Sequence, residues 1–138
     1  MTFVIYPRAV AELTPLQLAL WLRLLEIRGM EEGESSWGDG PALWVNAKQV
    51  ANFTRDGTIE LRLTRPAIRA VKERLSAEPQ VILRGSSDWL GVRIDSERDF
   101  ALALELAREV PPLYLPADGT APKPPPTGAA MERRKRFH

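Results

Sequence analysis

The segment best suited to chemistry is a short polar run, Gly85-Ser86-Ser87-Asp88-Trp89. If it forms a turn at the end of a sheet, a small ligand could stack on the Trp89 indole and hydrogen-bond to the hydroxyls of Ser86 and Ser87. The alternative is a Ser/Asp-rich turn whose side chains bond to their own backbone, with Trp89 as a core residue that starts a strand. The pattern alone leaves both interpretations open.

Catalysis by one of these serines would need a base, and the sequence offers few. The chain has no Cys, and His138 is its single His, so a Ser-His-Asp triad or a His- or Cys-based metal site has no residues to form it. A lysine base such as Lys48 or Lys72 is conceivable. We therefore expect no catalytic residue, no metal and no cofactor, and we favour a protein that is not an enzyme.

A second candidate ligand site involves two more tryptophans, Trp37 and Trp44, which flank a Gly-Asp-Gly-Pro segment. Paired indoles around glycine can form a pocket wall. They can equally close a core, with each indole N–H bonded to a backbone carbonyl. The region of Trp37, Trp44 and Trp89 is thus the place where a small molecule would bind, if the chain binds one.

A compact basic run, Arg133-Arg134-Lys135-Arg136, lies near the C-terminus. On a flexible arm it could contact phosphates or an acidic protein surface, and it could equally be a solubilising terminus. Residues 111–138 hold five of the 19 basic but two of the 18 acidic residues. The preceding part of the chain is therefore slightly acidic, which is unusual for a nucleic-acid-binding domain.

Seven of the 12 prolines lie beyond Val110, where they exclude a regular helix or a central strand. With 138 residues the chain has room for one domain. We expect a single α+β domain over residues 1–112 and a proline-rich mobile arm over 113–138, so that removal of everything after Pro112 leaves the fold intact. The sequence shows no secretory leader and no apolar stretch of about 20 residues, which predicts a cytoplasmic protein.

Helix caps and alternating patterns predict the elements. Thr14, Thr64 and Ser96 each precede an amphipathic stretch as an N-cap residue, whereas Glu31 to Gly40 is acidic and Gly-rich and predicts a loop. The order α-β-β-β-α-β-β-α predicts a two-layer α+β fold, with an antiparallel sheet of about five strands covered on one face by three helices. The expected helices are 14–28, 65–78 and 96–109, and the expected strands are 42–46, 49–54, 58–63, 81–84 and 89–94.

Four segments in this order resemble the small bacterial proteins of the luciferase-domain family, over about residues 35–110. They are Trp37 to Lys48, Ile59 to Thr64, Ala77 to Pro79 and Ser86 to Arg93. The family name implies no established reaction, and the resemblance implies a protein of unknown function. Many relatives carry a His where this chain has Asn52, and an amide cannot transfer protons as imidazole does. The element order is also similar to that of YjbR-like proteins.

Three functions remain open from the sequence. The first is a non-enzymatic binding or protein-interaction module that uses the exposed sheet face or an edge, where a second copy or another protein would bind. The second is a small-molecule-binding protein or enzyme that uses the tryptophan region. The third is weak nucleic-acid binding through the basic run. No membrane association is expected.

Overall fold

A single antiparallel sheet organises the chain. The structure, a computed structural model, describes residues 13–36 and 40–136. The strands pair in the order β1-β2-β3-β4-β6-β5, and every pair is antiparallel. The strands are β1 (Glu31–Glu34), β2 (Pro41–Val45), β3 (Lys48–Phe53), β4 (Thr58–Arg62), β5 (Val81–Leu83) and β6 (Trp89–Arg93). The helices are α1 (Pro15–Leu25), α2 (Arg65–Leu75), α3 (Glu97–Arg108), α4 (Val110–Tyr114) and α5 (Gly128–Arg136).

The predicted α+β class with an antiparallel sheet is confirmed, and three elements of the described structure were missed: β1, α4 and α5. The expectation that the prolines beyond Val110 exclude a helix is wrong for α4, whose first turn holds Pro111 and Pro112 where the missing N–H groups are tolerated. The loop expected over residues 31–40 is wrong for Glu31–Glu34, which form strand β1 at the edge of the sheet. An edge strand needs only the backbone pairing on one side, so its side chains show no apolar alternation. Glutamates on such an edge also hinder further strands from pairing with it.

The helix starts follow from the capping residues that the sequence contains. The Thr14 hydroxyl accepts the Gln17 N–H at 3.2 Å, and the Gln17 side chain accepts the Thr14 N–H at 3.0 Å. This reciprocal pair is a capping box, and it fixes the first turn of α1. Thr64 and Ser96 cap α2 and α3 in the same way with their hydroxyls. None of the helices in the described part of the chain is long and apolar enough to cross a membrane.

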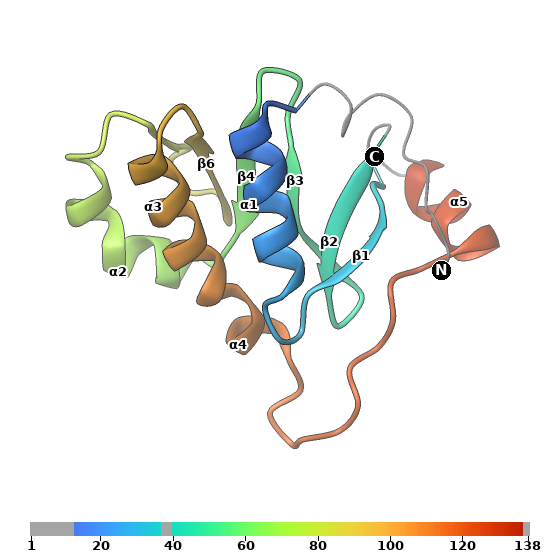
Figure 1. Cartoon of the computed structure of the whole chain (residues 1–138). Coiled ribbons are helices and arrows are strands. Elements are labelled where there is room, and N and C mark those ends of the chain that lie inside the picture. The colour runs from blue at the N-terminus through green and yellow to red at the C-terminus, as the bar shows by residue number, and fades with distance from the viewer. Residues whose placement is uncertain (1–12, 37–39, 137–138) are drawn as a thin grey trace.

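Helices α1 and α3 lie side by side on one face of the sheet (Figure 1). Their inward side chains meet alternate residues of the strands in one core, to which α2 adds Ile68 and Leu75. The core includes Leu20, Leu24, Leu43, Ile59, Leu61, Leu90, Val92, Leu104 and Leu106. We call this the helical face of the sheet and the opposite one the open face.

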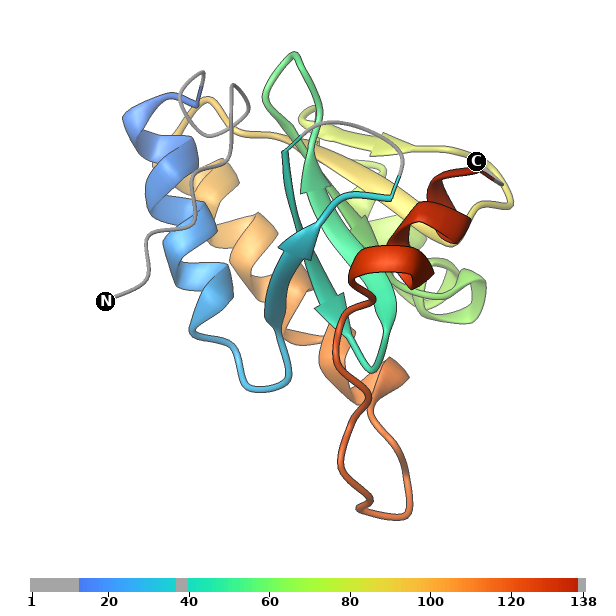
Figure 2. The same cartoon turned by 90° about the vertical axis from the view of Figure 1, so that its right-hand side faces the viewer.

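The open face is partly covered by α5, which lies across the sheet from α1 and α3 (Figure 2). Met131 of α5 is 1% exposed and packs with Ala42 and Trp44 in a second, smaller cluster. The Arg134 guanidinium carbon lies 5.4 Å from the centre of the Trp44 ring. A Cβ on Gly33 would lie 2.9 Å from the indole of Trp44, so only glycine lets this ring lie flat against β1.

The chain between α4 and α5 returns to the sheet along a defined path. The Tyr114 hydroxyl donates to the Leu63 carbonyl, and Leu115 packs against the main core. Asn46, in the β2–β3 turn, donates from its amide to the Tyr114 carbonyl and accepts the Lys123 N–H, both at 2.9 Å. The sequence placed a boundary at residue 112 and a mobile arm beyond it, whereas the structure packs parts of this segment against the rest of the chain.

Asp99, in the first turn of α3, is expected to make the stability of the fold depend on pH. Burial raises the pKa of this carboxyl, but hydrogen bonds from the Gln80 side chain, the Asp95 N–H and Ser96 outweigh it and hold the pKa below its ordinary value. A lowered pKa in the folded state contributes stability above the ordinary pKa, and this contribution disappears as the pH falls through the lowered value. We expect Asp99→Asn to lower the free energy of unfolding by about 1–3 kcal/mol at pH 7.

The difference between wild type and Asp99→Asn should shrink as the pH falls below about 4, the ordinary carboxyl range. Urea unfolding at a series of pH values measures it. Glu97→Gln is the matched control, because Glu97 lies exposed in the same first turn. This variant measures only the interaction of a negative charge with the helix dipole. A difference that stays constant from pH 7 to pH 2 would contradict this role of the carboxylate.

Candidate functional site on the open face of the sheet

Strand register gathers a set of polar side chains on the open face. Asn52 pairs with Glu60, Glu60 with Gly91, and Arg62 with Trp89. Directly paired residues point to the same side of a sheet, and their neighbours along each strand point to the other. Because the neighbours Leu61 and Leu90 lie in the helical core, these polar residues face away from α1 and α3.

Three buried polar atoms on this face have no hydrogen-bond partner among the residues that the structure describes. They are Asn52 Oδ1, Thr58 Oγ1 and Arg62 Nε. Asn52 is 9% exposed and Thr58 is 2% exposed. Because Asn52 pairs with Glu60, it is diagonal to both Thr58 and Arg62, at a Cα separation of about 7–8 Å. The three atoms therefore belong to one small area around Glu60, which we call the polar cluster.

Arg62 is held between two aromatic rings. Its guanidinium carbon lies 5.9 Å from the ring centre of Trp89 and 5.9 Å from that of Tyr114. Burial raises the pKa of the Tyr114 hydroxyl, and the nearby Arg62 charge counteracts this only in part. Among the described residues no carboxylate forms an ion pair with Arg62. The guanidinium is thus held beside the two rings and near the Tyr114 hydroxyl, without an ion-pair partner in the described part of the chain.

The other charges of the cluster compensate one another. Glu60, whose side chain is 17% exposed, forms an ion pair with Arg84 from the end of β5. Between them Gly91 keeps the face open, since a Cβ there would lie 2.9 Å from the methyl group of Thr58. In the described part of the chain the cluster therefore combines the Glu60–Arg84 ion pair, one arginine without an ion-pair partner, and the side-chain oxygens of Asn52 and Thr58 without a hydrogen-bond partner.

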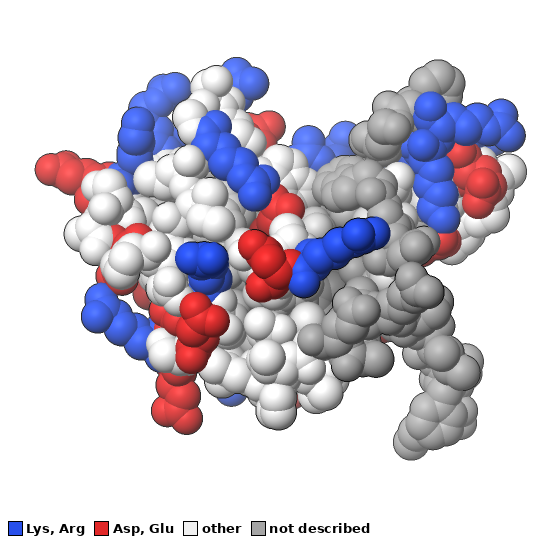
Figure 3. Space-filling view, turned by 90° about the horizontal axis from the view of Figure 1, so that it is seen from above, with Lys and Arg blue, Asp and Glu red and all other residues white. Residues whose placement is uncertain are grey.

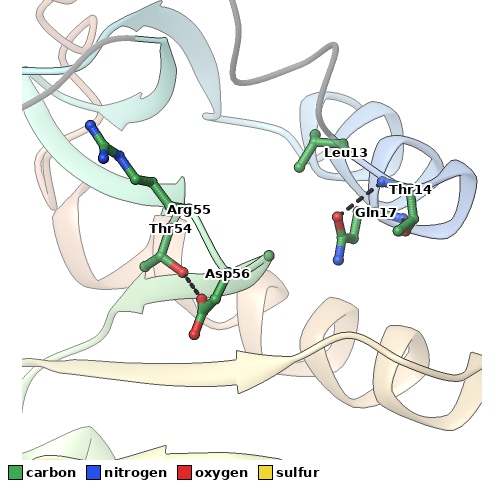
Figure 4. Close-up of a pocket in the computed structure, with 7 residues that line it drawn as sticks. Leu13, Thr14, Gln17, Thr54, Arg55 and Asp56 are labelled. Carbon is green, nitrogen blue, oxygen red and sulfur yellow. Dashed lines mark hydrogen bonds between the residues drawn. The ribbon is translucent and has the colours of Figure 1, made fainter.

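Two hollows flank the turn that joins β3 to β4. One of about 290 Å³ is lined by Thr54, Arg55, Asp56, Thr58, Ile82 and Arg84, and it adjoins the polar cluster through Thr58 and Arg84. The other, of about 190 Å³, lies between the turn and the start of α1, where Leu13, Thr14 and Gln17 face it (Figure 4). A hydrogen bond from the Thr54 hydroxyl is the main reason that the pKa of Asp56 is lowered.

The predicted Ser86–Trp89 segment lies at one end of the open face, and its polar groups serve the backbone. The Ser87 hydroxyl accepts the Trp89 N–H at 3.0 Å, and Asp88 accepts the Arg65 N–H at 2.9 Å at the start of α2. Ser86 is exposed, and Trp89 is half-buried beside Arg62. Of the four, Trp89 is the residue that the structure brings into the polar cluster.

Two members of the predicted tryptophan region, Trp44 and Trp89, lie apart in the described structure. Trp37 lies outside the described residues. Trp44 is 0% exposed beneath Met131, and its indole N–H donates to the Glu34 carbonyl at 3.1 Å. Trp44 and Trp89 share the open face, but β3 and β4 separate their strands, which places them about 14 Å apart at the usual strand spacing. The polar cluster lies between them.

The basic run forms the last turns of α5. Arg134 stacks on Trp44 and Lys135 forms an ion pair with Glu34. Arg133 and Arg136 are exposed and have no ion-pair partner in the described part of the chain. Basic and acidic side chains are interspersed on the face seen in Figure 3, so that view shows no broad basic surface that would extend the run.

In the sequence, Glu60 and Arg62 alternate with Ile59, Leu61 and Leu63, a period of two that puts the polar pair on the solvent-facing side of a strand. Asn52 stood out only for its departure from relatives. Neither Thr58 nor Tyr114 was predicted as a site residue. One signal was present in the sequence. Asn52 stands in the middle of the apolar strand Val50-Ala51-Asn52-Phe53, and a buried amide there needs hydrogen-bond partners. The contribution of Tyr114 depends on tertiary packing and left no such signal.

The comparison with known families bears on the part of the chain that carries most of this cluster. Residues 47–110 match the family model described as Luciferase domain. This range runs from β3 to the first residue of α4, and it includes Asn52, Thr58, Arg62 and Trp89 but not Tyr114 or α5. No curated protein and no solved structure matches the chain. The stretch from residue 47 to residue 110 thus matches the Luciferase domain, the family that the sequence resembles.

Proposed function

We propose that the chain is a non-enzymatic binding protein that holds a small polar ligand on the open face of its sheet. The observation that carries the proposal is the polar cluster on adjacent strands, in which Asn52 Oδ1, Thr58 Oγ1 and Arg62 Nε have no hydrogen-bond partner among the described residues. A buried polar atom without a partner costs about 1–3 kcal/mol. Folded proteins keep few of them, and sites that complete their hydrogen bonds with a ligand are one reason to do so.

Self-association through the sheet edges is less well supported. The β1 edge carries the glutamates Glu31, Glu32 and Glu34, and the β5 edge is three residues long. Short and charged edges are the means by which proteins prevent edge pairing.

Nucleic-acid binding by the basic run is also less well supported. The contacts of Arg134 and Lys135 with the domain leave two exposed cations, Arg133 and Arg136, for phosphates. These two would give a salt dependence of about −1.8 in log K against log[salt].

The proposal predicts that Asn52→Leu makes the protein more stable and unable to bind. Leucine has the same branching pattern as asparagine and removes the acceptor that has no partner in the described structure, so we expect the free energy of unfolding to rise by about 1 kcal/mol. Urea unfolding measures this change. A thermal-shift screen of hydroxy acids, amino acids, sugars and nucleosides should yield compounds that raise the Tm of the wild type but not that of the variant.

Gln49→Leu is the matched control, on the same strand. Gln49 is 2% exposed, but its amide is fully used: it accepts the N–H and the hydroxyl of Ser36 at 2.9 Å and donates to the Ser35 hydroxyl at 3.3 Å. We expect this variant to lose about 1–3 kcal/mol. If Asn52→Leu is destabilised as much as Gln49→Leu, and no compound distinguishes it from wild type, the proposal is wrong.

A further inference from the structure

We infer that the ligand of the open face is a small organic carboxylate that also carries a hydrogen-bond donor, with Arg62 as the residue that recognises the anion. The inference rests on the proposed function and specifies its ligand. It follows from what each end of the polar cluster lacks. Among the residues that the structure describes, Arg62 has no ion-pair partner and Asn52 Oδ1 accepts no hydrogen bond.

The Arg62 end fits a planar anion. The rings of Trp89 and Tyr114, each centred 5.9 Å from the guanidinium carbon, restrict the orientation of the guanidinium plane. A guanidinium that is fixed in this way has lost its rotational freedom before the ligand arrives, and its parallel N–H groups match the two oxygens of a carboxylate. Its Nε is buried and has no hydrogen-bond partner in the described structure, so the Nε–H group can donate to an oxygen of the ligand.

The carboxylates around this end form no ion pair with Arg62 in the described structure. Glu60 is paired with Arg84, and Asp88 accepts the Arg65 N–H. Asp88 keeps its negative charge near Tyr114, whereas Arg93 pairs with Thr58 at the other end of β4 from Arg62. An anion at Arg62 would therefore bind the arginine of the cluster that has no ion-pair partner among the described residues, and Asp88 would oppose it in part.

The Asn52 end determines which kind of group the rest of the ligand must carry. An amide oxygen can only accept, so the ligand must present an O–H or N–H group there. Asn52 and Arg62 are diagonal neighbours on adjacent strands, with Cα atoms about 7–8 Å apart, which a single ring or a chain of a few carbons can span. An inorganic anion on Arg62 is too small to reach Asn52 as well.

The test is an NMR titration of the full chain labelled with ¹⁵N, in which the Arg62 Nε–Hε and Asn52 side-chain resonances are followed. The probes are 4-hydroxybenzoate, which has both groups, benzoate, phenol and inorganic phosphate. We expect 4-hydroxybenzoate to shift both resonances and to bind at least tenfold more tightly than phenol. Benzoate should bind with intermediate affinity and shift mainly the Arg62 resonance.

Two arginine variants separate recognition from general charge. Arg62→Gln should abolish the preference for 4-hydroxybenzoate over phenol, and Arg62→Lys should restore only part of it, because lysine has the charge without the planar fork. Arg93→Gln is the matched control on the same face and should keep the preference. Each variant is first compared with the wild type in its amide spectrum, so that loss of fold is recognised.

The outcomes distinguish the inference from the proposal beneath it. If phenol binds as tightly as 4-hydroxybenzoate and Asn52→Leu abolishes both, the open face is a ligand site and the carboxylate inference is wrong. If phosphate produces the full Arg62 shift and no probe moves the Asn52 resonance, the cluster is an inorganic-anion site and the inference is again wrong. If none of the probes moves either resonance, the carboxylate inference is wrong, and the comparison of Asn52→Leu with Gln49→Leu and the ligand screen decide the proposed function.

Discussion

Trp44→Ala should lower the free energy of unfolding by about 3–5 kcal/mol, the usual range for a large aromatic side chain reduced to Ala in a core. Trp44 is fully buried, and from its own strand, β2, it contacts both β1 and α5. Its ring lies against β1 at Gly33, beneath Met131 of α5, and below the Arg134 guanidinium. Such a loss is a large share of the roughly 5–15 kcal/mol that stabilises a typical domain.

The measurement is urea unfolding followed by circular dichroism, with Trp89→Ala as the matched control. Trp89 also faces the open side of the sheet but is only half-buried, so its removal should cost clearly less. In a double-mutant cycle, Met131→Ala should add little to Trp44→Ala, because the two side chains form one cluster. Additive losses, or equal losses for both tryptophans, would contradict this account of α5.

Removal of residues 113–138 should lower the Tm by roughly 10 °C or more. This contrasts with the sequence-based expectation that the fold would be unaffected. The deletion takes away Met131, for which loss of the side chain alone is worth about 2–5 kcal/mol. It also removes the Tyr114 hydrogen bond to Leu63 and the packing of Leu115. For a chain of this size each kcal/mol corresponds to roughly 4 °C.

A shorter deletion, of residues 127–138, measures how much of this decrease in Tm comes from α5 alone. It removes α5 but keeps the segment from Tyr114 to Lys123 that Asn46 holds through two hydrogen bonds. Calorimetry of the full chain and the two deletions should give three separate melting temperatures in the order of their lengths. Three coincident melts would mean that the segment beyond residue 112 contributes nothing to the fold.

Local sequence patterns predicted most of the sheet and helices. Ile59, Leu61 and Leu63 alternate with polar residues, and this period of two both defines β4 and assigns its faces. Thr14 with Gln17 predicts the start of α1 because the capping pair satisfies its own hydrogen bonds locally. In these cases the residues that decide the structure are close in sequence, so no knowledge of the tertiary fold is needed.

Features that depend on distant partners could not be predicted in this way. β1 forms because it pairs with Pro41–Val45. Its own sequence, EEGE, has a low strand propensity. Proline content suggested an unstructured arm, but proline excludes regular ladders and not packing, and Pro125 lies close to Gly33. The polar cluster likewise arises from the pairing of β3, β4 and β6, which places Asn52 next to Glu60 and Trp89 next to Arg62.

The docking of α5 has a consequence for the order in which the molecule folds and opens. The Lys135–Glu34 pair joins residues 101 positions apart, so loop-closure entropy opposes this contact until the sheet exists. A nine-residue helix is marginal in water by itself, so α5 should become helical only as Met131 docks. Backbone amides of residues 128–136 should then exchange with solvent deuterium through an opening that leaves β3 and β4 protected, as the last element to form and the first to detach.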